Sequence, residues 1–351
     1  MTRKLILITA GLLALTGAGY ISTPAAQQQP VVFQPHPSTQ DPKNLVTPAQ
    51  MKKWETELSN WGRWGKNDQR GALNLITPEK TQQATKLVKE GVTVTLTHFA
   101  SLEKALDNWN FGETKHWMTN VDPQTGRVTS ALDGISFAIH DGTNSHMDAL
   151  CHYAVDRDGQ RIIYNGYPQN LDQKGCKDLA VDRMGPGYVT RGVLVDMPLL
   201  KGVEWLPEHT PIYISDLEAW EKYAGIKVSS GDALFVRTGR WARRAKTGPW
   251  NHARMAAGLH ASVLPWLKAR GVSLLAGDAV NDVQPSGVEG RNRPIHDLTQ
   301  VFIGLPLVDN GYFEDVAAQA ARLRRWEFMA TWQIMKIPGG TASPFNAMAT
   351  F

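Results

Sequence analysis

Seven runs rich in β-branched and aromatic residues are spaced through the chain, and they constrain the fold more than any other feature. Such runs predict β-strands. Three amphipathic segments between them carry the end signals of α-helices, including Ser215 and Glu218 in capping-box spacing. This mixture indicates an α/β protein. The predicted strands lie within 92–100, 134–140, 188–197, 232–239, 272–278, 301–309 and 326–335, and the predicted helices within 215–225, 259–271 and 313–325.

One domain is predicted over residues 51–351, because no composition break, long linker or internal repeat interrupts this stretch. Hydrophobic residues make up 42% of the 351 residues and charged residues 20%, so a sizeable core is available and general disorder is excluded. Residues 27–50 are rich in Gln and Pro and predict a flexible lead-in.

The first 26 residues are typical of an export signal. Arg3 and Lys4 form a basic start, LILITAGLLALTG is a short apolar stretch, and STPAA offers small residues for cleavage. We therefore expect a periplasmic or secreted protein, with a retained membrane anchor as the alternative. Residues 1–26 contain no acid, so their removal lowers the formal net charge from +4 to +2. Such a small charge gives no reason to expect nucleic acid or an anionic membrane as partner.

Only two cysteines are present, Cys151 and Cys176. An exported protein meets oxidising conditions in which they could pair. A disulfide also requires their Cα atoms to lie close together, and the sequence leaves this open.

A cluster of metal-capable side chains occupies the stretch HDGTNSHMDALCH. His146 and Asp148 are two residues apart and point the same way if the segment is extended, so both could grip one ion. His152 follows Asp148 by four residues, the spacing of one helical face. Nitrogen and carboxylate ligands suit Zn²⁺, Mn²⁺ or Fe²⁺ better than Ca²⁺. The alternative is a polar turn at His140 whose histidines only bond to backbone.

Further polar residues follow predicted strands later in the chain. Asp278 and Asp282 come at the end of an apolar run, and His296 and Asp309 flank the next one. Taken alone, His296 is typical of a surface or capping histidine and Asp309 of a turn.

The chain resembles the cyclase family of metal-dependent hydrolases, which includes bacterial kynurenine formamidase and isatin hydrolase. The family signature runs roughly H-x-G-T-H-x-D-A-P-x-H, and its second half is similar to HMDALCH at residues 146–152. The resemblance spans residues 55–347 and implies a swivelling β/β/α fold in a single domain, assembled as a homodimer or homotetramer. The other matching stretches are WGRWGKNDQRGALNLITPEK, YNGY, GDALFVRTGRW, LLAGDAVNDVQPSG, IHDLTQVFIGLPLVDN and IPGGTASPFN.

The resemblance also implies roles for individual residues. His146 and Asp148 would bind a first divalent ion, Mn²⁺ or Zn²⁺, and Asp148 would bridge to a second if two are bound. His296 and Asp309 stand at the later ligands, although the family usually has glutamate in place of Asp309. His152 stands at the catalytic histidine.

The first ligand departs from the family pattern. The short signature places a histidine six residues before the aspartate, where this chain has Gly142, whereas His140 lies eight residues before it. We expect a two-residue expansion that lets His140 reach the ion, with the amide of Asn144 as the alternative.

The implied reaction is hydrolysis of a C–N bond in an amide, formamide or lactam, or of a lactone or ester. Metal-bound hydroxide would attack the carbonyl of a small-molecule substrate, and His152 would act as acid and base. Substrate contacts are expected from His260, Arg240, Trp241 and Asp278.

Two other classes remain open. Twelve tryptophans in an exported protein are compatible with a carbohydrate-binding protein or glycosidase, in which Trp61, Trp64, Trp241 and Trp250 would be exposed platforms. A glycosidase uses two acids and would leave the histidine cluster unexplained. The third class is a metal-binding protein without catalysis.

Overall fold

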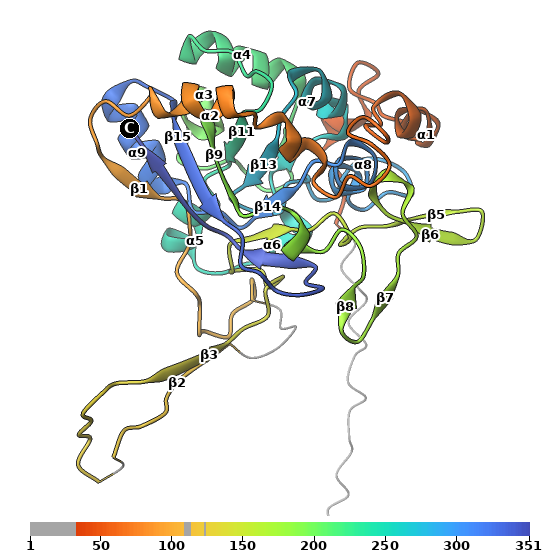
Figure 1. Cartoon of the computed structure of the whole chain (residues 1–351). Helices are drawn as coiled ribbons and strands as arrows, with labels where there is room; N and C mark the ends of the chain where they lie inside the picture. The colour runs from red at the N-terminus through yellow and green to blue at the C-terminus, as the bar shows by residue number, and fades with distance from the viewer. Residues whose placement is uncertain (1–32, 109–113, 123) are drawn as a thin grey trace, which may run out of the picture. The chain divides into compact units, whose positions relative to one another are not determined.

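The computed structural model describes residues 33–108, 114–122 and 124–351. Its central element is a nine-stranded mixed sheet (Figure 1). Strands β9, β11, β13 and β14 are parallel neighbours, and the strands on either side of this group pair antiparallel. The order across the sheet is β1 (Thr93–Thr95), β17 (Asn346–Thr350), β15 (Glu327–Gln333), β9 (Gly187–Asp196), β11 (Ala233–Arg237), β13 (Leu274–Gly277), β14 (Leu307–Asp309), β4 (His146–Asp148) and β16 (Ala342–Pro344).

The parallel strands form the core because they are apolar along their whole length. Every residue of β13 is buried, as are all but the last of β11, which is typical of strands covered on both faces. Helix α4 (Ile214–Ala224) packs on β9, where the buried Trp220 donates from its indole nitrogen to the Leu194 carbonyl at 2.8 Å. Figure 1 shows α2, α4 and α7 in the upper part of the view. The other helices are α1 (Pro48–Glu57), α2 (Pro78–Thr85), α3 (Met197–Lys201), α5 (Arg240–Thr247), α6 (His252–Met255), α7 (Leu264–Arg270), α8 (Pro294–Leu298) and α9 (Glu314–Leu323).

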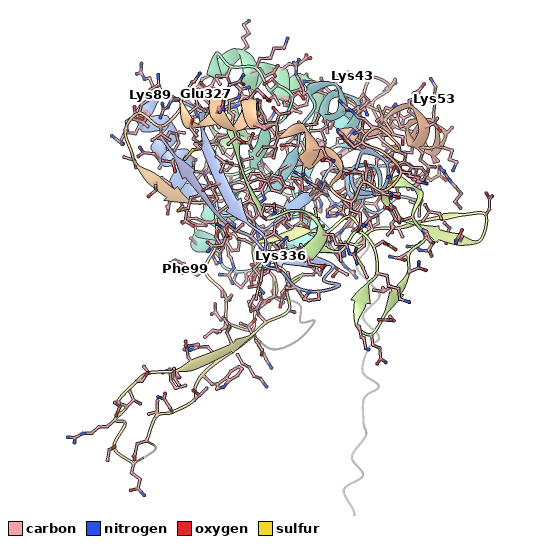
Figure 2. The ribbon with its side chains drawn as sticks, viewed as in Figure 1. Lys43, Lys53, Lys89, Phe99, Glu327 and Lys336 are labelled. Carbon is pink, nitrogen blue, oxygen red and sulfur yellow. A yellow bond between two sulfur atoms is a disulfide. The ribbon has the colours of Figure 1, made fainter. Side chains whose placement is uncertain are left out.

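Four short strand pairs lie outside the main sheet: β2–β3, β5–β6, β7–β8 and β10–β12. The β2–β3 pair forms an arm that extends away from the sheet (Figure 1). Phe99, labelled in Figure 2 where the chain leaves the sheet, is 89% exposed. The bounds are β2 (Lys115–Met118), β3 (Asp133–Ser136), β5 (Val155–Arg157), β6 (Gln160–Ile162), β7 (Leu171–Asp172), β8 (Gly175–Cys176), β10 (Pro211–Ile212) and β12 (Gly258–Leu259).

Most predicted elements are confirmed within shorter bounds, and three details are wrong. The strand predicted over 134–140 ends at Ser136, so the chain turns before it reaches His140. The first half of the run at 301–309 is a π-helix, Thr299–Ile303, and only its end is a strand. The predicted capping box is also shifted: α4 begins at Ile214, and Asp216, rather than Glu218, accepts from the backbone N–H before the helix.

The start of the chain was expected to be a signal at 1–26 and a lead-in at 27–50. Residues 1–32 lie outside the described residues. The described part of the lead-in packs on the domain: Thr39 is buried, and the Ser38 hydroxyl lies 2.8 Å from the Tyr213 hydroxyl. No helix of the described ranges is both long and apolar enough to span a membrane.

Cys151 and Cys176 form a disulfide, which settles the question that the sequence left open. Both cysteines are buried. The bond ties the segment that follows β4 to the end of the β7–β8 hairpin, and it closes a sequence separation of 25 residues. Cys151 directly precedes His152, so the bond anchors the chain beside that histidine.

We predict that Cys176→Ser lowers the free energy of unfolding by about 2–4 kcal/mol, because the unfolded chain gains conformational freedom without the cross-link. Urea denaturation with and without reductant measures this. Reductant should lower the midpoint of the wild type and leave that of the variant unchanged. Equal midpoints for the oxidised wild type and the variant would contradict a stabilising disulfide.

Candidate metal centre

Strand β4 places two polar side chains at the centre of the site. His146 and Asp148 point to the same side of this strand, as their spacing predicted. Antiparallel pairing with β14 sets Asp309 opposite His146, and pairing with β16 sets Ala342 opposite Asp148. All three polar residues are buried. The sheet register therefore brings Asp309 to residues that precede it by some 160 positions.

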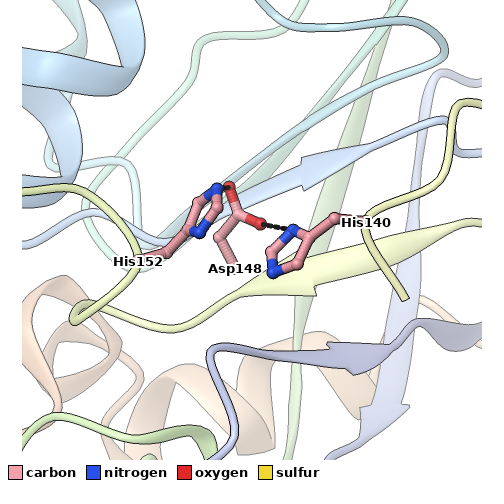
Figure 3. A group of neighbouring side chains, drawn as sticks. All are labelled: His140, Asp148 and His152. Carbon is pink, nitrogen blue, oxygen red and sulfur yellow. Dashed lines mark ion pairs between the residues drawn. The ribbon is translucent and has the colours of Figure 1, made fainter. Parts of the chain in front are cut away.

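Two further histidines reach Asp148 from the segments on either side of β4. Nδ1 of His140, in the turn before the strand, lies 3.4 Å from Oδ1 of Asp148. Nε2 of His152 lies 4.0 Å from Oδ2. Figure 3 shows that each oxygen of the carboxylate faces one of the two rings, with dashed lines marking both ion pairs. Ligand-capable atoms of these three residues lie within 4.8 Å of one another. His140 therefore reaches the site despite its altered spacing.

Helix α8 supplies the fourth histidine. Nε2 of His296 lies 3.8 Å from Oδ2 of Asp148 and 3.4 Å from Oδ2 of Asp309. On the other oxygen of Asp148, Nε2 of His146 lies 3.7 Å from Oδ1. Each Asp148 oxygen thus faces two histidines, His140 and His146 on one side and His152 and His296 on the other. This is the arrangement expected of a carboxylate shared between two groups of ligands.

The remaining ring nitrogens of three histidines are occupied by protein groups. Nδ1 of His146 lies 2.8 Å from the Asn144 carbonyl, and Nδ1 of His296 lies 2.5 Å from Oδ2 of Asp282. Nε2 of His140 lies 3.0 Å from the Thr341 hydroxyl. A carbonyl or carboxylate partner holds the proton on the nitrogen that faces it, which leaves the opposite nitrogen free to bind a metal.

The carboxylate of Asp148 has an uneven set of partners. Oδ2 accepts a hydrogen bond from the side-chain amide of Gln300 at 2.7 Å. Oδ1 is buried and accepts no hydrogen bond from any residue that the structure describes. Buried polar atoms in native proteins are nearly always satisfied. Oδ1 of Asp148, a buried acceptor without a hydrogen-bond donor and surrounded by imidazole nitrogens, is suited to bind a cation.

Charge in this cluster is distributed as in a metal site. Burial alone would raise the pKa of the Asp148 carboxyl, but His152, His140 and His146 hold that pKa well below its usual range. Burial lowers the pKa of His146, and it lowers the pKa of His152 to about 4. Both rings are therefore neutral near pH 7, the form that donates a lone pair to an ion.

His296 has the opposite balance. Burial opposes its positive charge, but Tyr153 and the carboxylates of Asp309 and Asp282 raise its pKa well above the usual value. Burial would raise the pKa of Asp309, but its interactions with His296 lower it. The carboxylates of Asp148, Asp282 and Asp309 lie around this one imidazole and favour positive charge there, which a divalent ion would also supply.

The structure does not bring the four expected substrate-contact residues to the cluster. Asp278 is buried and caps α5, where it accepts from the N–H groups of Thr238, Gly239 and Arg240. Buried Arg240 instead donates to the Gly142 carbonyl at 2.6 Å, so it braces the turn that contains His140. These contacts give no support to the predicted substrate-binding role of Asp278 and Arg240.

The other two residues are also engaged within the domain. Trp241 is 4% exposed and donates to the Gly311 carbonyl at 2.7 Å, so it is not the exposed platform that a carbohydrate-binding protein needs. His260 is buried, and its Nδ1 lies 3.0 Å from the Ser262 hydroxyl. Trp61, Trp64 and Trp250 are half-buried.

Sequence reasoning missed most of the residues that support the ligands. Asp282 had been noticed only as an acid after a strand, yet it orients His296. Asn281 donates to Oδ1 of Asp309 at 2.7 Å, and Gln300 donates to Asp148. Amide side chains bear no local signal for such a role, since any surface loop contains them. The position of Asp282 beside the end of a predicted strand was such a local signal, because metal ligands often lie there.

The chain matches a known protein family over more than half of its length. Buried histidines and carboxylates on an α/β sheet define a candidate metalloprotein, and residues 81–281 match the family described as "Putative cyclase". The chain belongs to this cyclase family, as its resemblance predicted. The comparison with curated proteins found no match.

Solved structures of similar fold support this placement. A structure described as a novel cyclase is 26% identical, with a TM-score of 0.74, over 85% of this chain and 99% of its own. Isatin hydrolase A from Ralstonia solanacearum is 19% identical, with a TM-score of 0.51, over 74% and 91%. Isatin hydrolase A from Labrenzia aggregata is 18% identical, with a TM-score of 0.51, over 76% and 96%. The predicted single-domain α/β fold of the cyclase type is confirmed.

We predict that Asp148→Asn reduces bound metal per chain to near zero, because an amide is a weaker ligand and both groups of histidines lose the shared anion. Elemental analysis of the purified protein measures this, and Asp315→Asn on the exposed side of α9 is the control. The unchanged circular dichroism spectrum of the variant should show that it is folded. Wild-type metal content in Asp148→Asn would show that this carboxylate is not a ligand.

Proposed function

We propose that the protein is a metal-dependent hydrolase that cleaves the C–N bond of an amide, formamide or lactam. The observation that carries this proposal is Asp148, whose two buried oxygens each face two histidines. Membership of the cyclase family supports it, as do two relatives of similar fold that are named isatin hydrolases. A lactone or ester is the neighbouring substrate class with the same carbonyl chemistry.

The residues present fit a divalent ion, Mn²⁺ or Zn²⁺. Imidazole nitrogen and carboxylate oxygen are the donors that both ions accept in catalytic sites. When bound, such an ion activates water and polarises the substrate carbonyl. The ligands would be His140, His146, Asp148, His296 and Asp309, and the sharing of Asp148 provides for one ion or two.

His152 is the proposed acid and base. Its side chain is 28% exposed, so a substrate and water can reach it, whereas those of His146 and His296 are 5% and 1% exposed. His140 is 25% exposed, but it is assigned to the ligands. The ring of His152 stacks on His140 with the ring centroids 4.1 Å apart, which fixes its orientation. A neutral imidazole held there can accept a proton from water and return it to the leaving nitrogen.

We predict that His152→Ala keeps the metal and lowers kcat by about 10²–10⁴, the usual contribution of a general acid–base group. Elemental analysis and steady-state kinetics measure the two quantities. His116→Ala, an exposed residue of the β2–β3 arm, is the control. Loss of metal together with activity would make His152 a ligand, and near-normal turnover with metal retained would move proton transfer to another group.

The reaction class is tested by a panel of simple formamides, lactams, lactones and glycosides. Protein stripped with a chelator and then reloaded with Mn²⁺ or Zn²⁺ is compared with the untreated protein. We expect hydrolysis of at least one amide-type substrate, lost on stripping and restored on reloading. Glycoside cleavage that survives stripping would favour a glycosidase, and tight metal binding without any hydrolysis would favour the non-catalytic alternative.

Localisation is a separate proposal. We propose that residues 1–26 are removed on export and that the mature protein begins near Gln27 in the periplasm or outside the cell. The basic start, short apolar stretch and small residues before Gln27 support this. N-terminal sequencing of the protein from its native host should find the new terminus. An intact Met1 would contradict export with cleavage.

Assembly into a homodimer or homotetramer is proposed as well. The β2–β3 arm exposes large apolar side chains that a second subunit could cover, namely Trp117, Met118, Leu132 and Ile135. Light scattering coupled to size exclusion should give a mass of two or four chains. A monomer at micromolar concentration would contradict this.

A further inference from the structure

A cavity of about 440 Å³ opens beside the metal-binding cluster. Tyr153 connects the two, because its ring lines the cavity while its centroid lies 5.0 Å from that of His152 and 4.9 Å from that of His296. No residue of the cluster lines the cavity itself, the cluster being His140, His146, Asp148, His152, His296 and Asp309. A substrate that reaches His152 can therefore place a remote group in this cavity.

The walls of the cavity carry one more positive than negative charge, with four cationic and three carboxylate side chains. Three of the cations are paired within 4 Å. Lys52 pairs with Glu55 at 2.7 Å, and Arg291 with Glu55 at 3.2 Å. Arg161 pairs with Asp156 at 3.1 Å. The excess positive charge therefore belongs to the fourth cation, Arg293.

The side chain of Arg293 has no hydrogen bond and no ion pair within 4 Å to any residue in the described ranges, although its backbone carbonyl accepts from the Asp297 N–H at 3.0 Å. Arg293 is half-buried and directly precedes α8, the helix that carries His296. Although burial disfavours its charge, Tyr153 and carboxylates of the cluster raise its pKa, so the guanidinium stays charged. A partly desolvated arginine without a direct hydrogen-bond or ion-pair partner is costly, which indicates that a ligand supplies the partner.

We propose that Arg293 is a substrate-binding residue, and that the hydrolysed amide or lactam carries a carboxylate which this guanidinium binds. The proposal rests on the hydrolase function proposed above. The planar fork of arginine matches a carboxylate with two parallel hydrogen bonds. Because the cavity is lined by Tyr153 and Arg293 but by no cluster residue, this carboxylate is remote from the bond that is cleaved. The substrate class is thus an anionic amide rather than a neutral one.

The test uses benzoate and benzamide, which have nearly the same shape and differ in charge. Isothermal titration calorimetry measures the affinity of both for metal-loaded wild type, Arg293→Gln, Arg293→Lys and Arg254→Gln. Arg254 is exposed and does not line the cavity, so its variant controls for the loss of one positive charge. Because all four proteins carry the same amount of metal, any direct contact of benzoate with the ion contributes equally to the four affinities.

We expect Arg293→Gln to weaken benzoate binding by at least about tenfold, the minimum effect of a lost charge-assisted hydrogen bond. Benzamide binding should be unchanged, Arg293→Lys should lie between wild type and Arg293→Gln, and Arg254→Gln should behave as wild type. Equal effects on benzoate and benzamide, or no effect on benzoate, would overturn the proposal. If either of these contradicting results is obtained with a protein that still binds metal and hydrolyses amides, the anion site is disproved and the hydrolase function stands.

The two proposals fail in different ways. If wild type discriminates benzoate from benzamide through Arg293 but neither binds metal nor hydrolyses any amide, the hydrolase function fails and the anion site remains. Melting temperatures of the variants show whether they are folded. A Gln variant that fails to fold is replaced by Arg293→Lys, for which the loss of bidentate geometry alone must weaken benzoate and spare benzamide.

Discussion

The burial of the Asp148 carboxylate is the constraint on which the rest of the site depends. An ionised carboxylate without compensation is strongly destabilising inside a protein. Here it receives one hydrogen bond, from Gln300, and otherwise faces imidazole rings. The neutral rings of His146 and His152 cannot compensate the charge, but they can share a cation with it. The site therefore has the composition of a metal centre before any comparison is made.

A second layer of contacts holds the ligand segments together. Arg240 joins the turn before β4 to the end of β14, because it donates to the Gly142 carbonyl and, at 2.5 Å, to Oδ1 of Asn310. Asn310 in turn donates to the Asp141 carbonyl at 3.1 Å. Asp282 orients His296 from the loop after β13. These contacts fix the directions of the ligands, and a metal site needs such fixed directions to select its ion.

The sequence predicted the parts of the site that are local. Alternation along an extended segment was enough to pair His146 with Asp148, because a strand repeats every two residues. His296 and Asp309 became candidates only through the family resemblance, since nothing nearby in sequence shows which distant segments a sheet will bring together. Family resemblance and the pattern of apolar runs also gave the α/β fold correctly.

The differences between sequence and structure have physical causes too. Asp278 follows an apolar strand as a site residue often does, and in the structure it caps the first turn of α5, while its contact with substrate stays a prediction. The run at 301–309 is apolar throughout because it is buried, and burial alone does not distinguish a strand from the helical turn at Thr299–Ile303. The sequence likewise does not show which acids pair with the cavity cations. It therefore could not show that Arg291 is paired and that the side chain of Arg293 is not.

The central claim is that Asp148 is a metal ligand at the centre of a hydrolytic site. Anomalous diffraction from crystals grown with Zn²⁺ or Mn²⁺ tests it most directly. We predict an anomalous peak in contact with the Asp148 carboxylate, with histidine nitrogens at about 2.0–2.1 Å if the ion is Zn²⁺. The absence of a peak at the cluster in crystals of protein that hydrolyses amides would contradict the account.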